Sequence, residues 1–482
     1  MAKLKFALLP NHGYICYNIN IIRMYRLIFL LFVGLINLSI YSAGGYMFRL
    51  YLKDKDMTEY NINKPEEFLS VRAIERRNKQ QIGIDSTDLP VSSVYIKQLE
   101  ELGYDIAVKS KWMNTISVHC RDSIQIQKVG KLNFVDSVLF VWKKDTTAVK
   151  KKRANIKKGK ILDKPHNIYG YGYEQLRIIN GEVLHQRGFK GKGLEIAVID
   201  AGYKNFKDIL LLDNVIVKGQ KDFVYEGENM FESSDHGLKV LSVIAANRPD
   251  IYIGTAPEAA FWLLRSEDGR SEYPIEEDYW VAAAEYADSV GVDIINTSLG
   301  YTNFNFSAKS YVHEQLDGKI SFITRAAEKA VGKGIFVEVS AGNEGGAKWH
   351  KIAVPSDAEN VLTVGSIKID SLVSYFSSRG PTADGRIKPD VVALGSKICV
   401  IGSDGEIERS DGTSFAGPVM SGIVACLWQA YPQLTNLQLL DIIRKSSHRY
   451  EKPNNSYGYG IPDMKKAMEI ASLYIDEINN RK

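Results

Sequence analysis

Three residues with complementary chemistry occur along the chain in the order Asp200, His236, Ser414. Ser414 lies in the run Gly412-Thr413-Ser414-Phe415-Ala416-Gly417-Pro418, at the start of an apolar segment that predicts a buried helix. Free N–H groups and the positive end of the helix dipole stabilise developing negative charge at such a position. A serine there is more often a helix cap than a nucleophile, so its interpretation depends on the other two residues.

Asp200 and His236 each occupy a position where a side chain can reach a ligand. Asp200 ends the apolar run 194–199, which predicts a buried parallel strand, and the carboxyl end of such a strand faces the ligand crevice of an open α/β sheet. His236 opens an apolar segment that predicts a helix. Singly, the aspartate could be a cap and the histidine a core residue. Together, in this order, they match one arrangement of the serine–histidine–aspartate triad.

The chain resembles the subtilisin-like serine proteases, or subtilases, from about residue 169 to its end. The motifs that carry the resemblance lie at residues 198–202, 235–237, 295–300, 340–345, 377–381, 385–390 and 412–418. Two motifs depart from the usual family pattern. Ala201 replaces the Thr or Ser that follows the aspartate, and Leu238 and Lys239 replace the Thr and the second His after His236-Gly237. The triad positions themselves are retained.

The resemblance implies a role for each residue. Ser414 would attack the peptide carbonyl, His236 would take and return the proton, and Asp200 would orient the imidazole. Asn343, just after the predicted strand 335–339, matches the side-chain donor to the oxyanion, although an isolated Ala-Gly-Asn is also an ordinary turn.

Two short segments resemble the walls of the substrate pocket. One wall is Ser298, Leu299 and Gly300, which would pair with the peptide as an added strand, and the facing wall is Ser340, Ala341 and Gly342. Ala353 is aligned with the base of the pocket. These small or apolar side chains predict a medium or large apolar residue before the scissile bond.

An acidic group precedes a predicted helix that contains Tyr279 and Trp280. Its members are Glu267, Asp268, Glu272, Glu276, Glu277 and Asp278. Carboxylates are favoured at helix starts, which is the simpler interpretation. Selection of basic substrate residues further from the cut is the alternative.

The chain divides into four predicted regions. Residues 1–45 are a signal region, in which Arg23 and Arg26 precede an apolar run too short to span a membrane comfortably, with Met24 as the expected true start. Residues 46–142 form a small domain, residues 143–164 a basic linker, and residues 165–482 the peptidase domain. No cysteine stands directly after the apolar run, so we expect no lipid anchor, and we expect export to the periplasm or the cell exterior.

The small domain predicts a β-α-β-β-α-β order, which is typical of a ferredoxin-like fold. In subtilases a domain in this position implies a propeptide that assists folding and inhibits the enzyme; an unrelated accessory domain is the alternative. For residues 165–482, alternating strands and helices predict a three-layer α/β fold with a mainly parallel sheet.

The charge distribution, the cysteines and one possible calcium segment limit the ligands that this chain could bind. Residues 143–160 carry a net charge of +8, so the rest of the chain is near −4 and predicts no nucleic-acid surface. Cys399 and Cys426 lie in apolar runs and are expected to be buried thiols. No cofactor is required. The sequence does not decide whether the segment Asn247-Arg248-Pro249-Asp250 binds calcium, because Arg248 has no side-chain oxygen to offer as a ligand.

The expected partners are protein or peptide substrates and the chain's own propeptide as an intramolecular inhibitor. The main alternative function is a catalytically impaired subtilase that acts as a binding or scaffold protein, which Ala201 and the missing second histidine would favour. A metal-dependent hydrolase is less favoured, because no His-Glu-x-x-His spacing occurs.

Overall fold

A seven-stranded parallel sheet forms the centre of the larger domain in the computed structural model, which describes residues 45–144, 166–227, 229–306 and 309–480. The strand order is β13-β12-β11-β10-β5-β9-β6, and every described pairing in this sheet is parallel. The strands are β5 (Glu195–Asp200), β6 (Ile216–Asp222), β9 (Ala260–Arg265), β10 (Ile294–Thr297), β11 (Phe336–Ser340), β12 (Leu362–Ile367) and β13 (Val391–Leu394). The predicted α/β fold is confirmed.

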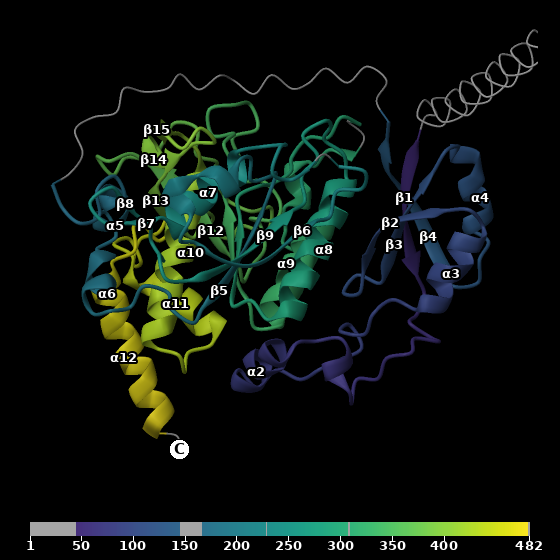
Figure 1. Ribbon diagram of the computed structural model, residues 1–482, viewed down its shortest axis with the longest axis horizontal. Helices are drawn as coiled ribbons and strands as arrows, with labels where there is room; N and C mark the ends of the chain where they lie inside the picture. Colours follow the sequence, from purple (N-terminus) through teal and green to yellow (C-terminus); the bar gives the residue numbers. More distant parts are fainter. Residues whose placement is uncertain (1–44, 145–165, 228, 307–308, 481–482) are drawn as a thin grey trace, which may run out of the picture.

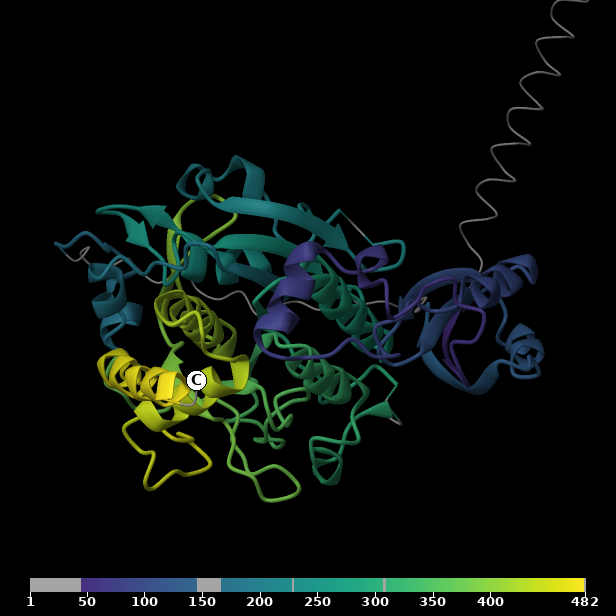
Figure 2. The same ribbon diagram turned by 90° about the horizontal axis from the view of Figure 1, so that it is seen from below.

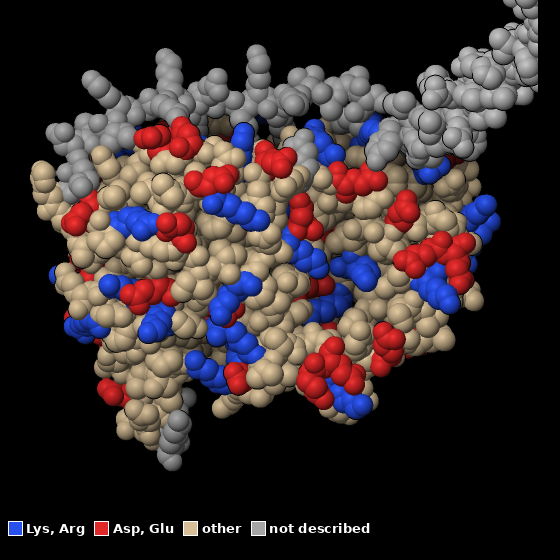
Figure 3. Space-filling view, viewed as in Figure 1, with Lys and Arg blue, Asp and Glu red and all other residues tan. Residues whose placement is uncertain are grey.

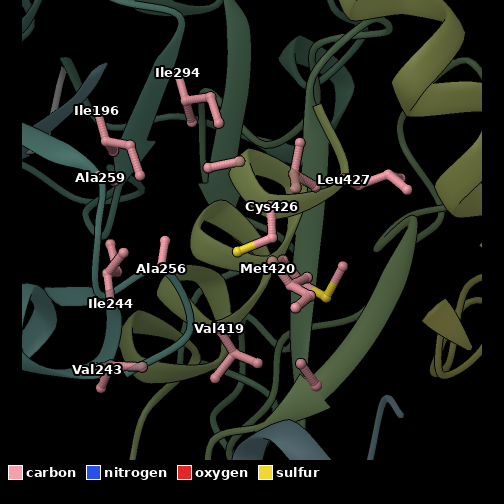
Figure 4. Packing of buried hydrophobic residues seen from close by; sticks show 14 of the residues in the cluster. Ile196, Val243, Ile244, Ala256, Ala259, Ile294, Val419, Met420, Cys426 and Leu427 are labelled. Carbon is pink, nitrogen blue, oxygen red and sulfur yellow. The ribbon is translucent and has the colours of Figure 1, made fainter. Parts of the chain in front are cut away.

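Helices cover both faces of this sheet (Figure 1). Alternate residues of a strand point to opposite faces, so each strand packs against helices on both sides. Ile196 and Val198 of β5 join the core cluster that contains α7 (His236–Ala245) and α10 (Thr413–Ala430). Their neighbours on β5 join the cluster that contains α8 (Ile275–Val290) and α9 (Phe322–Gly332). Figure 4 shows the first cluster, where Met420 and Cys426 of α10 lie among strand and α7 residues.

Smaller elements complete the larger domain. They are α5 (Tyr173–Arg177), α6 (Glu182–Gln186), α11 (Asn436–Ser446), α12 (Met464–Asn480), and two hairpins, β7 (Asn247–Arg248) with β8 (Tyr252–Ile253) and β14 (Ile398–Ile401) with β15 (Ile407–Ser410). Cys399 and Cys426 are buried free thiols, as expected. Acidic and basic side chains are interspersed over the face seen in Figure 3.

The N-terminal domain has the predicted ferredoxin-like order. Its antiparallel sheet runs β2-β3-β1-β4 and pairs β1 with both β3 and β4. The strands are β1 (Tyr46–Leu52), β2 (Asp105–Ser110), β3 (Thr115–Cys120) and β4 (Val135–Lys143), and the helices are α3 (Ser93–Glu101) and α4 (Ile126–Val129). One face of the sheet packs on these helices, while Met47, Val108 and Val141 on the other face pack against Tyr279 and Ala282 of α8.

Polar contacts hold this sheet on α8. Arg49 of β1 forms two hydrogen bonds to Asp278, at 2.7 and 2.5 Å, and its guanidinium lies 3.5 Å from the ring centroid of Phe322. Glu285 accepts hydrogen bonds from the Ser110 hydroxyl and the backbone N–H groups of Lys111 and Trp112. At the start of α8, Asp278 and Glu277 are therefore buried contacts of the N-terminal domain as well as helix-start carboxylates.

Residues 53–92, between β1 and α3, form a second contact that we call the arm. The arm contains α2 (Val71–Lys79), which begins at an N-cap, where the Ser70 hydroxyl accepts the Ala73 N–H. In Figures 1 and 2, α2 lies away from the rest of its domain, beside the lower ends of α8 and α9. Arg76 donates to the Val292 carbonyl, and Gln80 donates to the Gly334 carbonyl. The arm thus contacts the larger domain at the amino-terminal end of the parallel strands.

Most of the predicted signal region (residues 1–45) and of the basic linker (residues 143–164) lies outside the described residues. Within the described part of the chain, no helix is both long and apolar enough to cross a membrane.

Candidate active site

Asp200 and His236 meet at the carboxyl end of the central sheet. Asp200 is the last residue of β5, and His236 is the first residue of α7. The His236 Nδ1 and Asp200 Oδ1 atoms lie 2.7 Å apart, with the Asp200 side chain 1% exposed and that of His236 27% exposed. A buried carboxylate at Nδ1 fixes the ring so that Nε2 is the nitrogen left to exchange a proton.

Only one of the two oxygens of the Asp200 carboxylate has hydrogen-bond partners among the described residues. Its Oδ1 also accepts the Ala201 N–H at 2.6 Å, whereas Oδ2 is buried without a hydrogen-bond partner among the described residues. Ala201, the next residue, has no side-chain hydroxyl that could donate to this oxygen.

Ser414 lies in the first turn of α10, as predicted, and lines the same cleft as His236. Its hydroxyl donates to the Ser298 carbonyl at 3.2 Å. Catalytic hydrogen bonds often form only with substrate in place, so this hydroxyl must rotate toward His236 before it can be deprotonated. The ring of Phe415 lies 5.7 Å from that of His236, centroid to centroid, and borders the imidazole.

Asn343 stands after β11, as predicted, and is held by the residue that precedes the serine. Its Oδ1 accepts hydrogen bonds from the Thr413 N–H at 2.9 Å and the Thr413 hydroxyl at 3.0 Å. Because the oxygen of the amide is engaged, its NH₂ group is the end that can donate to an oxyanion. Thr413 was not among the predicted site residues, although the serine motif contains it.

One cleft of about 280 Å³ brings the predicted residues together. It is lined by the four predicted catalytic residues and by five of the six predicted substrate-binding residues: Ser298, Leu299, Gly300, Ser340 and Gly342. Ala341 is fully buried and does not line it. Ala353 also lines the cleft, which agrees with its alignment to the pocket base.

Two glutamates of the acidic group also line this cleft, Glu267 and Glu272. They lie close to Glu276, with carboxylate oxygens of all three within 4.8 Å of one another. Burial, followed by the charge of Glu267, raises the pKa of Glu276 well above its usual value. Glu276 is therefore held in its neutral form, and Glu267 and Glu272 are the members of this group that face the cleft.

For the segment 247–250, the sequence left calcium binding undecided. In the structure this segment lies in a hairpin, where Arg248 pairs with Asp213 and donates to the Leu210 carbonyl at 2.6 Å. A guanidinium so placed occupies the position of the side chain that would have to supply an oxygen ligand.

Two family models match the chain. The model described as the subtilase family covers residues 191–460, and the peptidase S8 propeptide domain of Bacteroidota covers residues 47–158. Serine protease AprX of Bacillus subtilis (strain 168) is 31% identical over 311 residues, which are 58% of this chain and 66% of AprX. Subtilisin E of the same organism is 28% identical over 62% of this chain and 71% of its own length. The chain thus spans just under two thirds of the length of AprX.

The subtilase model covers more than half of the chain, and the folds of both domains agree with the two family models. This chain therefore belongs to the subtilase family of serine peptidases and carries a propeptide domain of that family ahead of its peptidase domain.

Proposed function

We propose that this protein is a serine endopeptidase that is exported as a zymogen and cleaves peptide bonds through Asp200, His236 and Ser414. The observation that carries the proposal is the 2.7 Å contact between His236 and Asp200 in the cleft that Ser414 and Asn343 also line. This set of groups contains a nucleophile, a base, an orienting carboxylate and an oxyanion donor.

In the proposed mechanism, the Ser414 hydroxyl gives its proton to His236 Nε2 and attacks the substrate carbonyl carbon. Asp200 stabilises the imidazolium that forms. Asn343 Nδ2 and the Ser414 N–H donate to the oxyanion. His236 then protonates the leaving amine, which departs and leaves an acyl-enzyme, and water attacks the acyl-enzyme by the same route in reverse.

Substrate preference follows from the walls of the cleft. We infer that the peptide pairs with residues 298–300 as an added strand. The small side chains around Ala353 leave room for a medium or large apolar residue before the cut. The glutamates on the wall add attraction for basic residues further from the cut.

Export and self-processing complete the proposal. Residues 1–45 have the composition of a signal peptide, and the basic linker joins the propeptide domain to the peptidase domain, so that a cut in the linker would separate the two. The first cut is expected between Val141 and Lys164. With Ser414→Ala, the protein should accumulate with residues 46–142 attached; a variant that still matures alone in a protease-free preparation would contradict self-cleavage.

A serine-directed fluorophosphonate tests the central claim. The processed protein should be labelled at Ser414 and should cleave peptides with Leu, Phe, Tyr or Met before the scissile bond, while Ser414→Ala should do neither. Absence of labelling and of cleavage in the folded, processed protein would favour the scaffold alternative.

A further inference from the structure

A glutamate lies fully buried in the central sheet, directly beneath the helix that carries Ser414. Glu338 is the middle residue of β11, between β10 and β12, and is 0% exposed. Gly417 of α10 lies against it, since a Cβ atom on this glycine would be only 2.2 Å from Glu338 Oε1. Any larger residue at position 417 would displace this carboxyl group.

A chain of hydrogen bonds connects Glu338 with the backbone of Ser414. Glu338 Oε2 lies 3.3 Å from the Ser421 hydroxyl, which lies 2.9 Å from Asn296 Oδ1. Asn296 Nδ2 donates to the Ser298 hydroxyl at 3.0 Å, and this hydroxyl donates to the Ser414 carbonyl at 3.0 Å. Ser298 also accepts the Ser414 hydroxyl on its own carbonyl, so the chain ends at the nucleophile.

The directions of these bonds determine where the protons lie. The Ser421 hydroxyl has one hydrogen and two acceptors within reach, Asn296 Oδ1 at 2.9 Å and Glu338 Oε2 at 3.3 Å, so it donates to the nearer one, Asn296. Toward Glu338 the hydroxyl can then only accept, and the carboxyl must supply the hydrogen. A carboxyl that donates is a neutral one.

The surroundings of the carboxyl agree with a neutral form. Burial raises the pKa of Glu338 well above its usual value. Its Oε1 has no hydrogen-bond partner among the described residues, which would be costly for a charged group. The groups that face it are uncharged: Ser421 and Gly417 of α10, and the Thr297 backbone of β10. The hydrogen bond with the Thr297 backbone lowers the pKa, but burial has the larger effect.

We propose that Glu338 is a positioning residue for the peptidase reaction: as a neutral acid, it sets the direction of the hydrogen-bond chain that holds Ser298 and Ser414. The inference rests on the proposed function, since it takes Ser414 as the nucleophile. Both ends of the chain matter, because Ser298 also forms one wall of the substrate cleft. A nucleophile displaced by about 1 Å can lose on the order of 10²-fold in rate.

Variants at both ends of the Glu338–Ser421 contact test the proposal. Glu338→Gln keeps a neutral donor and should retain kcat within about three-fold, whereas Glu338→Leu should lower kcat by about 10–100-fold at nearly unchanged KM. Ser421→Ala should match Glu338→Leu, and the double variant should be no slower than either single one, because both remove the same contact. The readouts are kcat and KM on a peptide with Leu before the cut, with the thermal midpoint measured in parallel.

Thr363→Val serves as the control, because it removes one buried hydrogen bond, to the Ser356 carbonyl, on the neighbouring strand β12. It should lower the thermal midpoint and leave kcat unchanged. The proposal is overturned if Glu338→Leu behaves like this control, or if Glu338→Gln is as slow as Ser421→Ala; the latter comparison suffices even if the leucine variant does not fold. A wild-type enzyme that neither reacts with the fluorophosphonate nor cleaves peptides would instead overturn the proposed function, and this inference with it.

Discussion

Arg76 of the arm and Asp288 of α8 form a buried ion pair at 2.5 Å, although 212 residues separate them along the chain. Asp288 also pairs with Arg77 at 2.7 Å, and none of the three side chains is more than 3% exposed. A second aspartate, Asp88 of the arm, pairs with both Arg77 and Lys333 of the larger domain. Each domain thus buries charges whose partners come from the other domain.

Removal of one partner from this network should destabilise the zymogen strongly. Arg76→Ala in a Ser414→Ala background should lower the free energy of unfolding by about 1.5–3 kcal/mol, because Asp288 loses one charged hydrogen bond and keeps Arg77. Thermal or urea unfolding of the full chain measures this. Lys97→Ala removes an exposed ion pair to Glu101 and should change stability by less than about 1 kcal/mol. Equal effects of the two substitutions would contradict the structural importance of the arm.

Asn343→Ala should lower kcat by about 10²–10³-fold with little change in KM, because the oxyanion exists only after attack. Thr413→Val, which keeps Asn343 but removes the hydroxyl that holds its amide, should cause a smaller loss. Steady-state kinetics on one peptide substrate compares the two. A larger effect on KM than on kcat would place Asn343 in substrate binding instead.

A hydroxyl at position 201 should complete the partners of Asp200. Ala201→Thr offers a donor to the unpaired Oδ2 and should raise kcat/KM a few-fold over Ala201→Val, which has nearly the same shape without the hydroxyl. Hydrogen bonds to charged groups contribute about 1.5–3 kcal/mol, which sets the upper bound of the gain. Identical kinetics for the two variants would show that the lone carboxylate oxygen has no cost.

Glu277 should make the stability of the zymogen depend on pH. Burial raises the pKa of Glu277 to about 7, from an ordinary value of 4.5. Between these two pKa values the folded state holds a proton that the unfolded chain has lost. The contribution of Glu277 to the free energy of unfolding is therefore fully present below about pH 4.5 and is lost as the pH rises through 7. The loss is at most about 3 kcal/mol. Thermal midpoints from pH 5 to 8 should fall less steeply for Glu277→Gln than for the parent; parallel curves would refute the assignment.

Glu272 should favour basic residues on the acyl side of the cut, because it lines the cleft beside residues 298–300. Glu272→Gln should lower kcat/KM a few-fold for peptides with Lys or Arg two to four residues before the cut, since a partly exposed charge pair contributes about 0.2–1 kcal/mol. Matched peptides with Gln at those positions should be cleaved equally by both enzymes. A similar loss on both peptide sets would assign Glu272 a structural role.

The positions of the candidate site residues followed from local sequence signals. The apolar run before Asp200 and the apolar segment after His236 predicted a strand end and a helix start, and both are present. Strand limits were displaced slightly: residues 335–339 were predicted where β11 covers Phe336–Ser340. Contacts between distant residues leave no trace in the local hydrophobic pattern. Element boundaries and the contact partners of side chains are therefore predicted least accurately.

The contacts that were not predicted depend on distant segments. Nothing in the sequence around α2 indicates that its arginines are buried, because their partners on α8 lie more than 200 residues away. Glu338 was visible as one acidic residue inside an apolar strand, but its role depends on Ser421 and Asn296 from two other elements. Such pairings are specified only by the assembled sheet and helix.

The two separate contacts of the N-terminal domain, its sheet on α8 and the arm at the start of the strands, make it a bivalent ligand of the peptidase domain. When one contact opens, the other keeps it at a high effective concentration, so both must open together for dissociation. The arm is joined to the sheet at both of its ends, through residues 53–70 to β1 and through residues 80–92 to α3. Proteolytic cuts on both sides of α2 would therefore be needed to separate the two contacts and convert one slow dissociation into two faster ones. The lifetime of the assembly of the two domains would then be set by the integrity of these two connecting segments, far from Ser414.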